Sequence, residues 1–203
     1  NRYYGFIDVN NLLSLSYKRN IEIAKDQNPL TKLPGNHQID YYINDAFKNQ
    51  HTQMTHIVYF DFDDFKPFND SYGFRQGDRA IILFCEILKK YIHINDFIAH
   101  IGGDDFFVGF KNESYENIFD QMCIIQKDFQ QSAKNLYNEI DINNGYLSSK
   151  DRFGTQRQFN LLSVSSAIIE ISLKTDKNNF DSVLGIIKKA SKRRQKCQYK
   201  GDM

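Results

Sequence analysis

The sequence predicts an α/β or α+β domain whose central sheet is flanked by helices. Short apolar runs rich in aromatic and β-branched residues, which are typical of buried strands, alternate along the chain with longer segments of helical periodicity. Adjacent glycines join two of the short runs, as in a tight β-hairpin. The chain has 203 residues, of which 41% are hydrophobic, so one such domain can bury a core of ordinary size.

The composition and the apolar runs of the chain argue against two kinds of partner. Charged residues make up 25% of the chain, but the formal net charge is only +1, which is not typical of a protein that binds nucleic acid. No apolar run approaches the roughly 18 residues that a membrane-spanning helix requires. We therefore expect no nucleic-acid partner and no membrane contact by this part of the chain. Because the first residue is Asn1 rather than Met, we expect a piece of a longer protein.

The first 27 residues are expected to form a lead-in. They end in a helix-like apolar spacing, and the turn-rich stretch "NPLTKLPGN" then breaks the pattern, which puts the start of the core domain near Asn28. The segment "YYGFIDVNNLL" resembles the last strand and helix of a CBS-type sensory module, which a linker helix would follow. We therefore predict a lead-in over residues 1–27 and one domain over residues 28–203.

The main domain alternates helical and extended segments. The run "HIVYFDF" predicts a buried strand, and the runs "DFIAHIG" and "DFFVGF" predict the two strands of a hairpin. In chain order we expect a helix over 36–50, a strand over 56–62, a loop over 68–78, a helix over 78–91, hairpin strands over 96–102 and 105–110, a helix over 113–137, an irregular loop over 141–159, one or two strands within 159–172, and a basic helix over 180–198.

Two adjacent carboxylates follow the hairpin turn. In "GGDDF", Gly102 and Gly103 permit a left-handed backbone and leave room for a ligand. The strand that follows fixes Asp104 and Asp105 at the mouth of the sheet. Neighbouring carboxylates repel each other, so their pairing favours a bound hard cation such as Mg²⁺. The alternative is a solvated hairpin tip, where Asp and Gly are common in any case.

A second acidic cluster follows the most strand-like run. Asp61 and Asp63 point to one face of the strand by its period of two, Asp64 comes next, and Lys66 adds a positive charge. The glycines of "YGFRQGD" would let the backbone approach a phosphate. Carboxylates from two strands beside a lysine predict a metal–phosphate site. The alternative is a charged loop after a buried strand.

Three motifs together resemble the GGDEF domain, the diguanylate cyclase family. The stretch "NPLTKLPGN" is similar to the family's D-x-L-T-G-L-P-N-R opening. The stretch "FDFDDFKPFNDSYGFRQGD" is similar to its D-x-D-x-F-K-x-x-N-D-x-x-G-H-x-x-G-D segment, and "GGDDF" is similar to its signature. The motifs occur in the family's order and spacing, and the long middle one is the most specific. The resemblance covers roughly residues 28–200.

The resemblance implies a fold and a reaction. The fold is a mostly antiparallel central sheet with flanking helices, similar to the palms of nucleotide cyclases and polymerases. In the reaction, two facing domains each hold one GTP, with Mg²⁺ or Mn²⁺ as cofactor, and join the two into cyclic di-GMP. A ribose 3′-hydroxyl attacks the partner's α-phosphate, and pyrophosphate leaves. The implied partners are GTP, a second GGDEF domain in a homodimer, and further domains of a longer cytoplasmic chain.

The resemblance also implies roles for individual residues. The metal ligands would be Asp61, the backbone carbonyl of Phe62, and Asp104; the catalytic acids would be Asp104 and Asp105. The implied GTP-binding positions are Asp64, Phe65 and Lys66 for the phosphates, Asn69 and Asp78 for the guanine, and Lys196 and Lys200 of the terminal helix for the phosphates again. For the last two lysines, the alternative is a solvated basic helix end.

Several positions depart from the family's pattern. Gly35 and Asn36 replace the Asn-Arg of the opening motif, Phe74 replaces a histidine, and His100 replaces the arginine before the signature. Asp105 replaces the usual glutamate and is shorter by one methylene. A misplacement of about 1 Å can cost on the order of 10²-fold in rate. The substitution therefore bears on catalysis more than on binding.

Three functions are compatible with this pattern. The first is an active diguanylate cyclase. The second is a catalytically degenerate GTP-binding module that regulates an attached domain, such as a cyclic di-GMP phosphodiesterase. The third is an interaction domain that binds no nucleotide, which would leave Asn69 and Asp78 without a role.

A feedback site of the family is altered as well. Many members carry an inhibitory product site, R-x-x-D, shortly before the signature. Here the stretch "HIND" keeps Asp96 but has His93 in place of the arginine. Arginine holds a phosphate or a guanine edge with two parallel hydrogen bonds, whereas histidine is shorter and largely neutral at pH 7. We therefore expect no product inhibition through this position.

Overall fold

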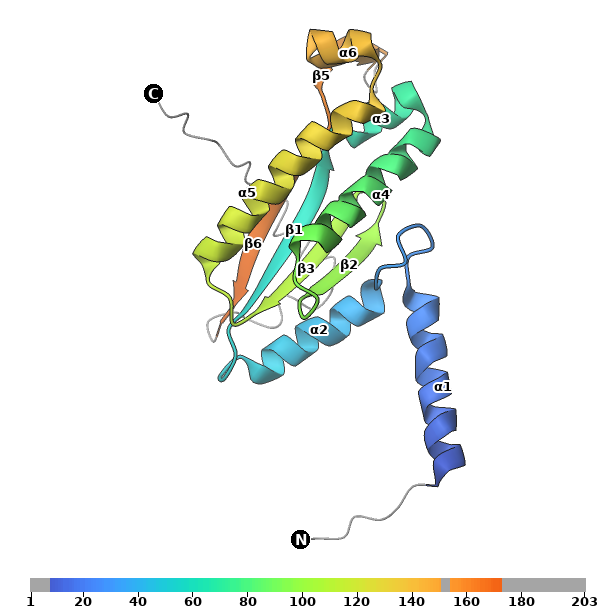
Figure 1. The fold of residues 1–203 in the computed structure, drawn as a ribbon, viewed down its shortest axis with the longest axis vertical. Coiled ribbons are helices and arrows are strands. Elements are labelled where there is room, and N and C mark those ends of the chain that lie inside the picture. The colour runs from blue at the N-terminus through green and yellow to red at the C-terminus, as the bar shows by residue number, and fades with distance from the viewer. Residues whose placement is uncertain (1–7, 151–153, 173–203) are drawn as a thin grey trace.

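A four-stranded antiparallel sheet in the order β2–β3–β1–β6 forms the centre of the structure (Figure 1). The computed structural model describes residues 8–150 and 154–172 of the chain. The sheet consists of β1 (Thr55–Asp63), β2 (Phe97–Gly102), β3 (Asp105–Lys111) and β6 (Ser163–Ile171). The predicted antiparallel sheet with flanking helices is therefore confirmed.

Helices cover both faces of this sheet. Helices α4 (Phe74–Tyr91) and α5 (Tyr115–Ser132) pack on one face, and α2 (Asn36–Asn49) packs on the other. The alternation of side chains along β1 explains the two apolar layers. Phe60 belongs to the larger layer beneath α4 and α5, and Tyr59 belongs to the smaller layer beneath α2.

Helix α1 (Val9–Asp26) extends away from the sheet (Figure 1). Its carboxyl end is docked onto the start of α2, because the Asp26 carboxylate accepts hydrogen bonds from the backbone N–H groups of His37 (3.1 Å) and Gln38 (3.0 Å). The lead-in thus contains a helix, as predicted. The domain boundary at residue 28 stays a prediction, and the start of the expected CBS-like segment lies outside the described residues.

The loop predicted over residues 68–78 is wrong, because most of the segment is helical. Helix α3 (Phe65–Tyr72) follows β1 almost directly, and α4 begins soon after it. Phe68 is fully buried and stacks on Tyr72, one helical turn later. Gly73, with a φ of 82°, separates the two helices. Because glycines and polar residues surround the few apolar residues of α3, its helical pattern is hard to recognise in the sequence.

The irregular loop predicted over residues 141–159 is also wrong. The segment holds most of the short helix α6 (Glu139–Asn144), and a hairpin of β4 (Tyr146–Lys150) and β5 (Gln156–Asn160). Gly145 ends α6 in the left-handed conformation, with a φ of 74°. The hairpin has mostly exposed side chains, so its sequence shows too little apolar alternation to predict strands.

The long helix predicted over residues 113–137 is confirmed with an earlier end. Helix α5 stops at Ser132, and a 3₁₀ turn (Ala133–Leu136) continues the chain. Strand β6 accounts for most of the extended segment expected within residues 159–172. The basic helix expected over residues 180–198 lies outside the described residues.

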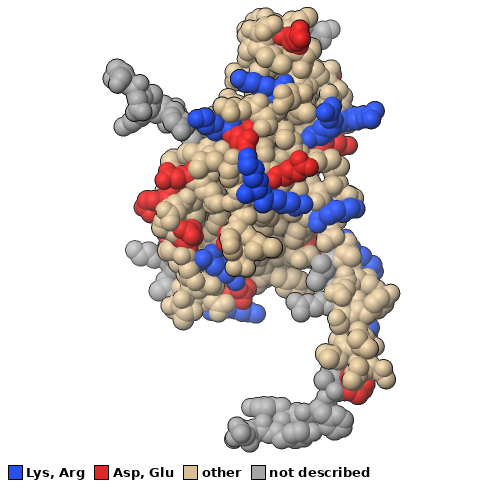
Figure 2. Space-filling model, in the orientation of Figure 1, with Lys and Arg blue, Asp and Glu red and all other residues tan. Residues whose placement is uncertain are grey.

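Surface charges are mixed on the face that carries α4 and α5. Figure 2 shows basic and acidic side chains interspersed on this face. Lys90 of α4 and Asp128 of α5, for example, form a salt bridge of 2.9 Å. The distribution agrees with the net charge of +1.

Candidate functional site

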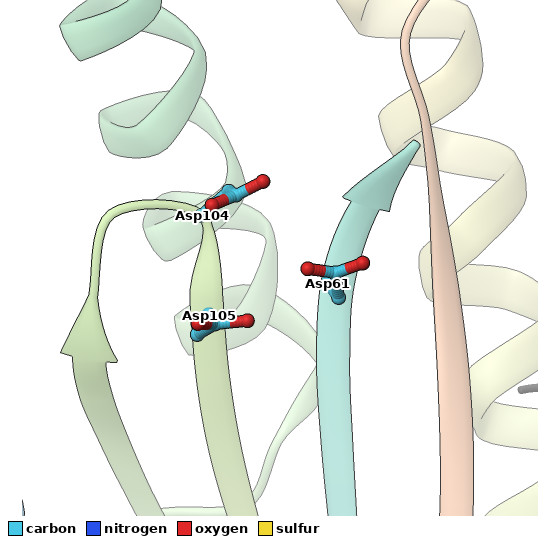
Figure 3. Close-up of side chains that lie close together, drawn as sticks. All are labelled: Asp61, Asp104 and Asp105. Atoms are coloured by element: carbon cyan, nitrogen blue, oxygen red, sulfur yellow. The ribbon is translucent and has the colours of Figure 1, made fainter. Parts of the chain in front are cut away.

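Three carboxylates meet at one end of the sheet (Figure 3). Asp61 and Asp105 are directly opposite each other in the pairing of β1 with β3, and Asp104 lies in the turn that precedes β3. One carboxylate oxygen from each of the three lies within 4.8 Å of the others, and all three residues are half-buried. The structure thus brings together acids from both of the clusters that stand out in the sequence.

The turn between β2 and β3 presents Asp104. Gly103 has a φ of 60° and Gly102 a φ of 147°, and the strand pairing shifts between His100 and Gly102. A Cβ added to either glycine would meet no atom within 4 Å. Backbone conformation, not crowding, therefore requires glycine here, and the space in front of the turn is open to a ligand.

Three negative charges at this spacing favour a bound cation. Carboxylates repel one another at this spacing unless a positive charge balances them. The three side chains offer only oxygen donors, which are the ligands that hard divalent cations such as Mg²⁺ and Mn²⁺ prefer. The donor set therefore fits the cation that the sequence suggests.

Asp63 is engaged by the neighbouring strand instead. Ser163 and Ser165 of β6 each donate a hydrogen bond of 2.7 Å from Oγ to its carboxylate. In the strand register Asp63 is paired with Ser163, and Asp61 with Ser165. Although Asp61 and Asp63 share a face of β1, the second carboxylate thus ties β1 to β6 and is not part of the group of three.

Tyr59 supports Asp105 from within the sheet. It lies two residues before Asp61 and therefore on the same face of β1. Its side chain is buried, and its hydroxyl donates a hydrogen bond to Oδ1 of Asp105. The motif comparison missed this residue, although the two-residue offset from Asp61 was a usable signal.

His100 connects the opening motif to the signature turn. Its Nδ1 lies 3.1 Å from the Thr31 hydroxyl and its Nε2 lies 2.9 Å from the carbonyl oxygen of Gly103. A carbonyl only accepts hydrogen bonds, so Nε2 carries a proton; in the neutral ring, Nδ1 then accepts a hydrogen bond from the Thr31 hydroxyl. Burial lowers the pKa of His100, and the ring stacks on Phe106. A neutral histidine thus holds the turn where the family has an arginine.

The start of α3 presents backbone N–H groups near the carboxyl end of β1. Asp64 is the N-cap in a left-handed conformation (φ 58°), and its side chain makes no capping hydrogen bond. Phe65 packs edge-to-face against Phe62, whose ring is buried in the core, and Lys66 is exposed. Because the N-cap side chain does not cap this helix N-terminus, its backbone N–H groups are suited to bind an anion such as phosphate.

Asn69 of α3 fits against α4 only because residue 77 is glycine. A Cβ at Gly77 would lie 2.0 Å from Oδ1 of Asn69. This oxygen is buried and has no hydrogen-bond partner. An unpaired buried acceptor is costly, and a ligand donor would relieve that cost. Asp78, the other predicted guanine contact, follows Gly77 in α4 and is exposed.

The remaining predicted residues lie away from the three acids or outside the described part of the chain. Lys196 and Lys200 are not among the described residues. His93 and Asp96 lie between α4 and β2, at the opposite end of β2 from the signature turn. Nδ1 of His93 accepts a hydrogen bond of 3.2 Å from the backbone N–H of Asn95, and burial raises the pKa of Asp96.

Fold and site together define a class of domain: an antiparallel sheet, flanked by helices, that presents carboxylates from a strand end and a glycine hairpin turn. Comparison with known families gives this class a name. Residues 25–158 match the family described as diguanylate cyclase, GGDEF domain. The chain therefore belongs to the GGDEF domain family, and the resemblance seen in its motifs is confirmed.

Curated relatives match this chain over parts of longer proteins. The chain is 33% identical over 88 residues to the bifunctional diguanylate cyclase/cyclic di-GMP phosphodiesterase MucR of Pseudomonas aeruginosa, covering 42% of this chain and 13% of MucR. It is 25% identical over 108 residues to the probable diguanylate cyclase DgcC of Escherichia coli, covering 52% and 29%. An uncharacterized membrane protein of Staphylococcus epidermidis is 25% identical over 162 residues, covering 76% and 45%.

The chain thus spans less than half the length of these three relatives. Over residues 8–150 and 154–172, the structure contains no helix with both the length and the apolar character that a membrane crossing needs.

Solved structures share the fold. The GGDEF domain of DgcB from Caulobacter crescentus, in complex with c-di-GMP, matches with a TM-score of 0.60 at 20% identity, over 82% of this chain and 86% of that one. A structure of the coiled coil and GGDEF domain of DgcB matches with a TM-score of 0.64 at 18% identity, over 89% and 84%. At these identities the similarity establishes the fold.

Proposed function

We propose that this domain binds GTP with a divalent cation, and that two copies of it condense two GTP molecules into cyclic di-GMP. The observation that carries the proposal is the group of Asp61, Asp104 and Asp105, whose oxygens lie within 4.8 Å of one another. Membership of the diguanylate cyclase family supports the choice of reaction.

The acid cluster is the proposed cation site. Asp61, Asp104 and the carbonyl of Phe62 would hold Mg²⁺ or Mn²⁺. When bound, such an ion supplies positive charge that stabilises the phosphates and makes a coordinated hydroxyl more acidic. Asp105, the third acid of the cluster, would offer its second carboxylate oxygen to the same cation, at the end of the site where the ribose 3′-hydroxyl reacts.

The junction of α3 with α4 is the proposed guanine site. Asp78 would accept hydrogen bonds from the N1–H and N2–H groups of guanine, and Asn69 would pair with the base edge through its amide. The unpaired Oδ1 of Asn69 supports this assignment, because it can accept from the N1–H or N2–H groups of guanine, whereas adenine has only the acceptors N1 and N3 on that part of its edge.

The phosphates would lie between the acid cluster and the junction of α3 with α4. The backbone at Asp64 and Phe65 and the side chain of Lys66 would bind them, since the start of α3 suits an anion. We also propose Lys196 and Lys200 as phosphate contacts from the terminal segment. Condensation of two nucleotides requires a second copy of the domain facing the first. Since the proposed substrate is GTP, we propose a cytoplasmic location, as part of a longer chain.

The second candidate is a GTP-binding module that regulates an attached domain without catalysis. The hydrogen bond from Tyr59 to Asp105 favours it, because the shorter acid is already engaged by the protein. The neutral His100 in place of an arginine favours it as well.

Incubation with GTP and Mg²⁺ or Mn²⁺, followed by chromatography of the products, tests the proposal. Cyclic di-GMP that forms with the parent protein and not with Asp104→Asn would establish the cyclase. Calorimetry that shows GTP binding without product formation would establish the regulatory module. If GTP does not bind at all, both candidates are wrong and an interaction domain remains.

A further inference from the structure

Tyr59 is a buried tyrosine whose hydroxyl ends at the acid cluster. In the strand register it lies opposite Phe107 of β3 and Ala167 of β6. Tyr59 is 2% exposed, and both cross-strand neighbours are equally inaccessible to water. The ring is therefore enclosed on the α2 face of the sheet, and its hydroxyl donates a hydrogen bond to Oδ1 of Asp105.

We infer that Tyr59 is a positioning residue that fixes the Asp105 carboxylate for cation binding. The inference rests on the cation site of the proposed function. Asp105 belongs to the group of three acids, and one of its oxygens is held by a donor on the strand that carries Asp61. The hydrogen bond links Asp105 of β3 to Tyr59 of β1, the strand that also carries Asp61. It therefore fixes the distance between the carboxylates of Asp105 and Asp61.

The hydrogen bond from Tyr59 matters because Asp105 has a shorter side chain than the glutamate that is usual in the family. A glutamate would bring its carboxylate one methylene further from the backbone, and an aspartate at this position lacks that reach. A hydrogen bond to Oδ1 restricts rotation of the carboxylate and leaves the lone pairs of the second oxygen for a cation. Hydrogen-bond partners that orient metal-binding carboxylates typically contribute 10- to 100-fold to metal affinity.

A purely structural role would give a different result. A buried tyrosine hydroxyl needs an acceptor whether or not a cation binds. In a purely structural role, removing the Tyr59 hydroxyl would therefore change only the stability of the fold. A positioning role predicts instead that cation affinity changes, and that it changes only while Asp105 is present. The two roles can therefore be separated by measuring both quantities on the same variants.

The test measures the affinity of the purified chain for Mn²⁺ in the absence of nucleotide. Electron paramagnetic resonance reports the concentration of the free ion during the titration. Tyr59→Phe, which removes only the hydroxyl, should weaken binding about 10-fold. Tyr91→Phe is the matched control, since the Tyr91 hydroxyl donates a hydrogen bond of 2.9 Å to Asp128, away from the three acids. It should leave Mn²⁺ affinity unchanged.

Asp105→Ala completes the comparison. In that background Tyr59→Phe should have no further effect on Mn²⁺ affinity, because the acceptor through which Tyr59 acts is gone. Thermal unfolding of each variant reports the structural contribution separately. Unchanged Mn²⁺ affinity in Tyr59→Phe, or the same loss with and without Asp105, would overturn the inference.

A second measurement covers the case in which Tyr59→Phe does not fold. Titration of the parent chain with Mg²⁺ should perturb the hydrogen bond to Asp105 and give a tyrosine ultraviolet difference spectrum that is absent in Asp105→Ala. The same spectrum in both proteins would overturn the role of Tyr59. A parent chain that binds neither Mn²⁺ nor Mg²⁺ would overturn the cation site itself, and cyclic di-GMP formation is measured independently.

Discussion

At the acid end of the sheet, where Asp61, Asp104 and Asp105 lie, hydrogen bonds within the chain fix part of the proposed site, whereas at the junction of α3 and α4 the proposed guanine contacts are unpaired or exposed. Asp105 accepts a hydrogen bond from Tyr59, and the signature turn is tied to His100 through the Gly103 carbonyl. At the junction, Oδ1 of Asn69 is buried without a partner and Asp78 is exposed.

The difference matches what each end is proposed to do. Phosphoryl transfer tolerates little displacement, so acids that hold a cation benefit from fixed geometry. Recognition of a base depends on polar groups that stay unpaired until the correct ligand pairs them. We therefore expect substitutions at the acid end to affect turnover most, and substitutions at the junction to affect nucleotide choice.

The largest effect is expected from Asp61→Asn and Asp104→Asn. Each removes one anionic oxygen from the cation site, and we expect cation-dependent nucleotide binding or turnover to fall by at least about 100-fold. A Mg²⁺ titration of each variant measures the loss. Asp120→Asn, an exposed aspartate on α5, is the matched control. Parent-like titrations of both variants would show that the acids are only surface charges.

The junction can be tested next by Asn69→Ala and Asp78→Ala. Each deletes a proposed hydrogen-bonding partner of guanine, so we expect GTP affinity to fall by roughly 10- to 100-fold with little change for ATP. Calorimetry with both nucleotides measures the discrimination, and Asn44→Ala on the surface of α2 is the control. Equal affinity of the parent for GTP and ATP, or no loss in Asp78→Ala, would remove the guanine assignment.

Gly77→Ala sharpens the same test without replacing a residue that is proposed to contact guanine. The added Cβ would lie 2.0 Å from Oδ1 of Asn69 and must displace that side chain. We expect a loss of GTP affinity similar to that of Asn69→Ala. Combining the two substitutions should cost little more than either alone, since both act through one side chain. Fully additive losses would mean that Gly77 matters for another reason.

The sequence predicts the sheet and the acids well because their signals are local. Apolar runs give β1, β2 and β3, and the period of two puts Tyr59 and Asp61 on one face. The link between Tyr59 and Asp105 could not be predicted in the same way. It depends on the register of β1 with β3, which pairs residues far apart in the chain.

The segments that were mispredicted have weak local signals. In α3, Pro67 directly precedes Phe68 and three polar residues follow it, which weakens the helical pattern. The left-handed conformation of Asp64 at the start of the helix is not indicated by its sequence. In the hairpin of β4 and β5, few side chains are buried, so tertiary packing rather than apolar alternation defines the strands. The unpaired oxygen of Asn69 is likewise a product of packing against Gly77.

A smaller effect is expected on the pH dependence of stability at the acid end. Burial lowers the pKa of His100 below its unfolded value of about 6.5, so the unfolded chain binds more protons between these two values. The contribution is complete above about pH 6.5 and is lost as the pH falls through the folded pKa. One such group gives a slope of at most about 1.4 kcal/mol per pH unit.

Urea unfolding at several pH values measures this slope. We expect it to become shallower in His100→Gln, while His56, whose pKa burial also lowers, keeps part of it. His51→Gln, an exposed histidine, should leave the slope unchanged. The raised pKa values of Asp40 and Asp96 act in the opposite direction, but they are common to all three proteins. Equal slopes for the parent and His100→Gln would contradict a neutral His100.

The smallest effect is expected at the far end of β2, where the family's feedback site would lie. His93 cannot make the two parallel hydrogen bonds of an arginine, and its Nδ1 already accepts from the backbone of Asn95. We therefore expect cyclic di-GMP to bind weakly there and Asp96→Ala to leave any product inhibition unchanged. Titration of the purified chain with cyclic di-GMP measures both. Tight binding that disappears in Asp96→Ala would show that the product site works without its arginine, and that a third region of the domain, besides the acid end and the junction, recognises guanine nucleotides.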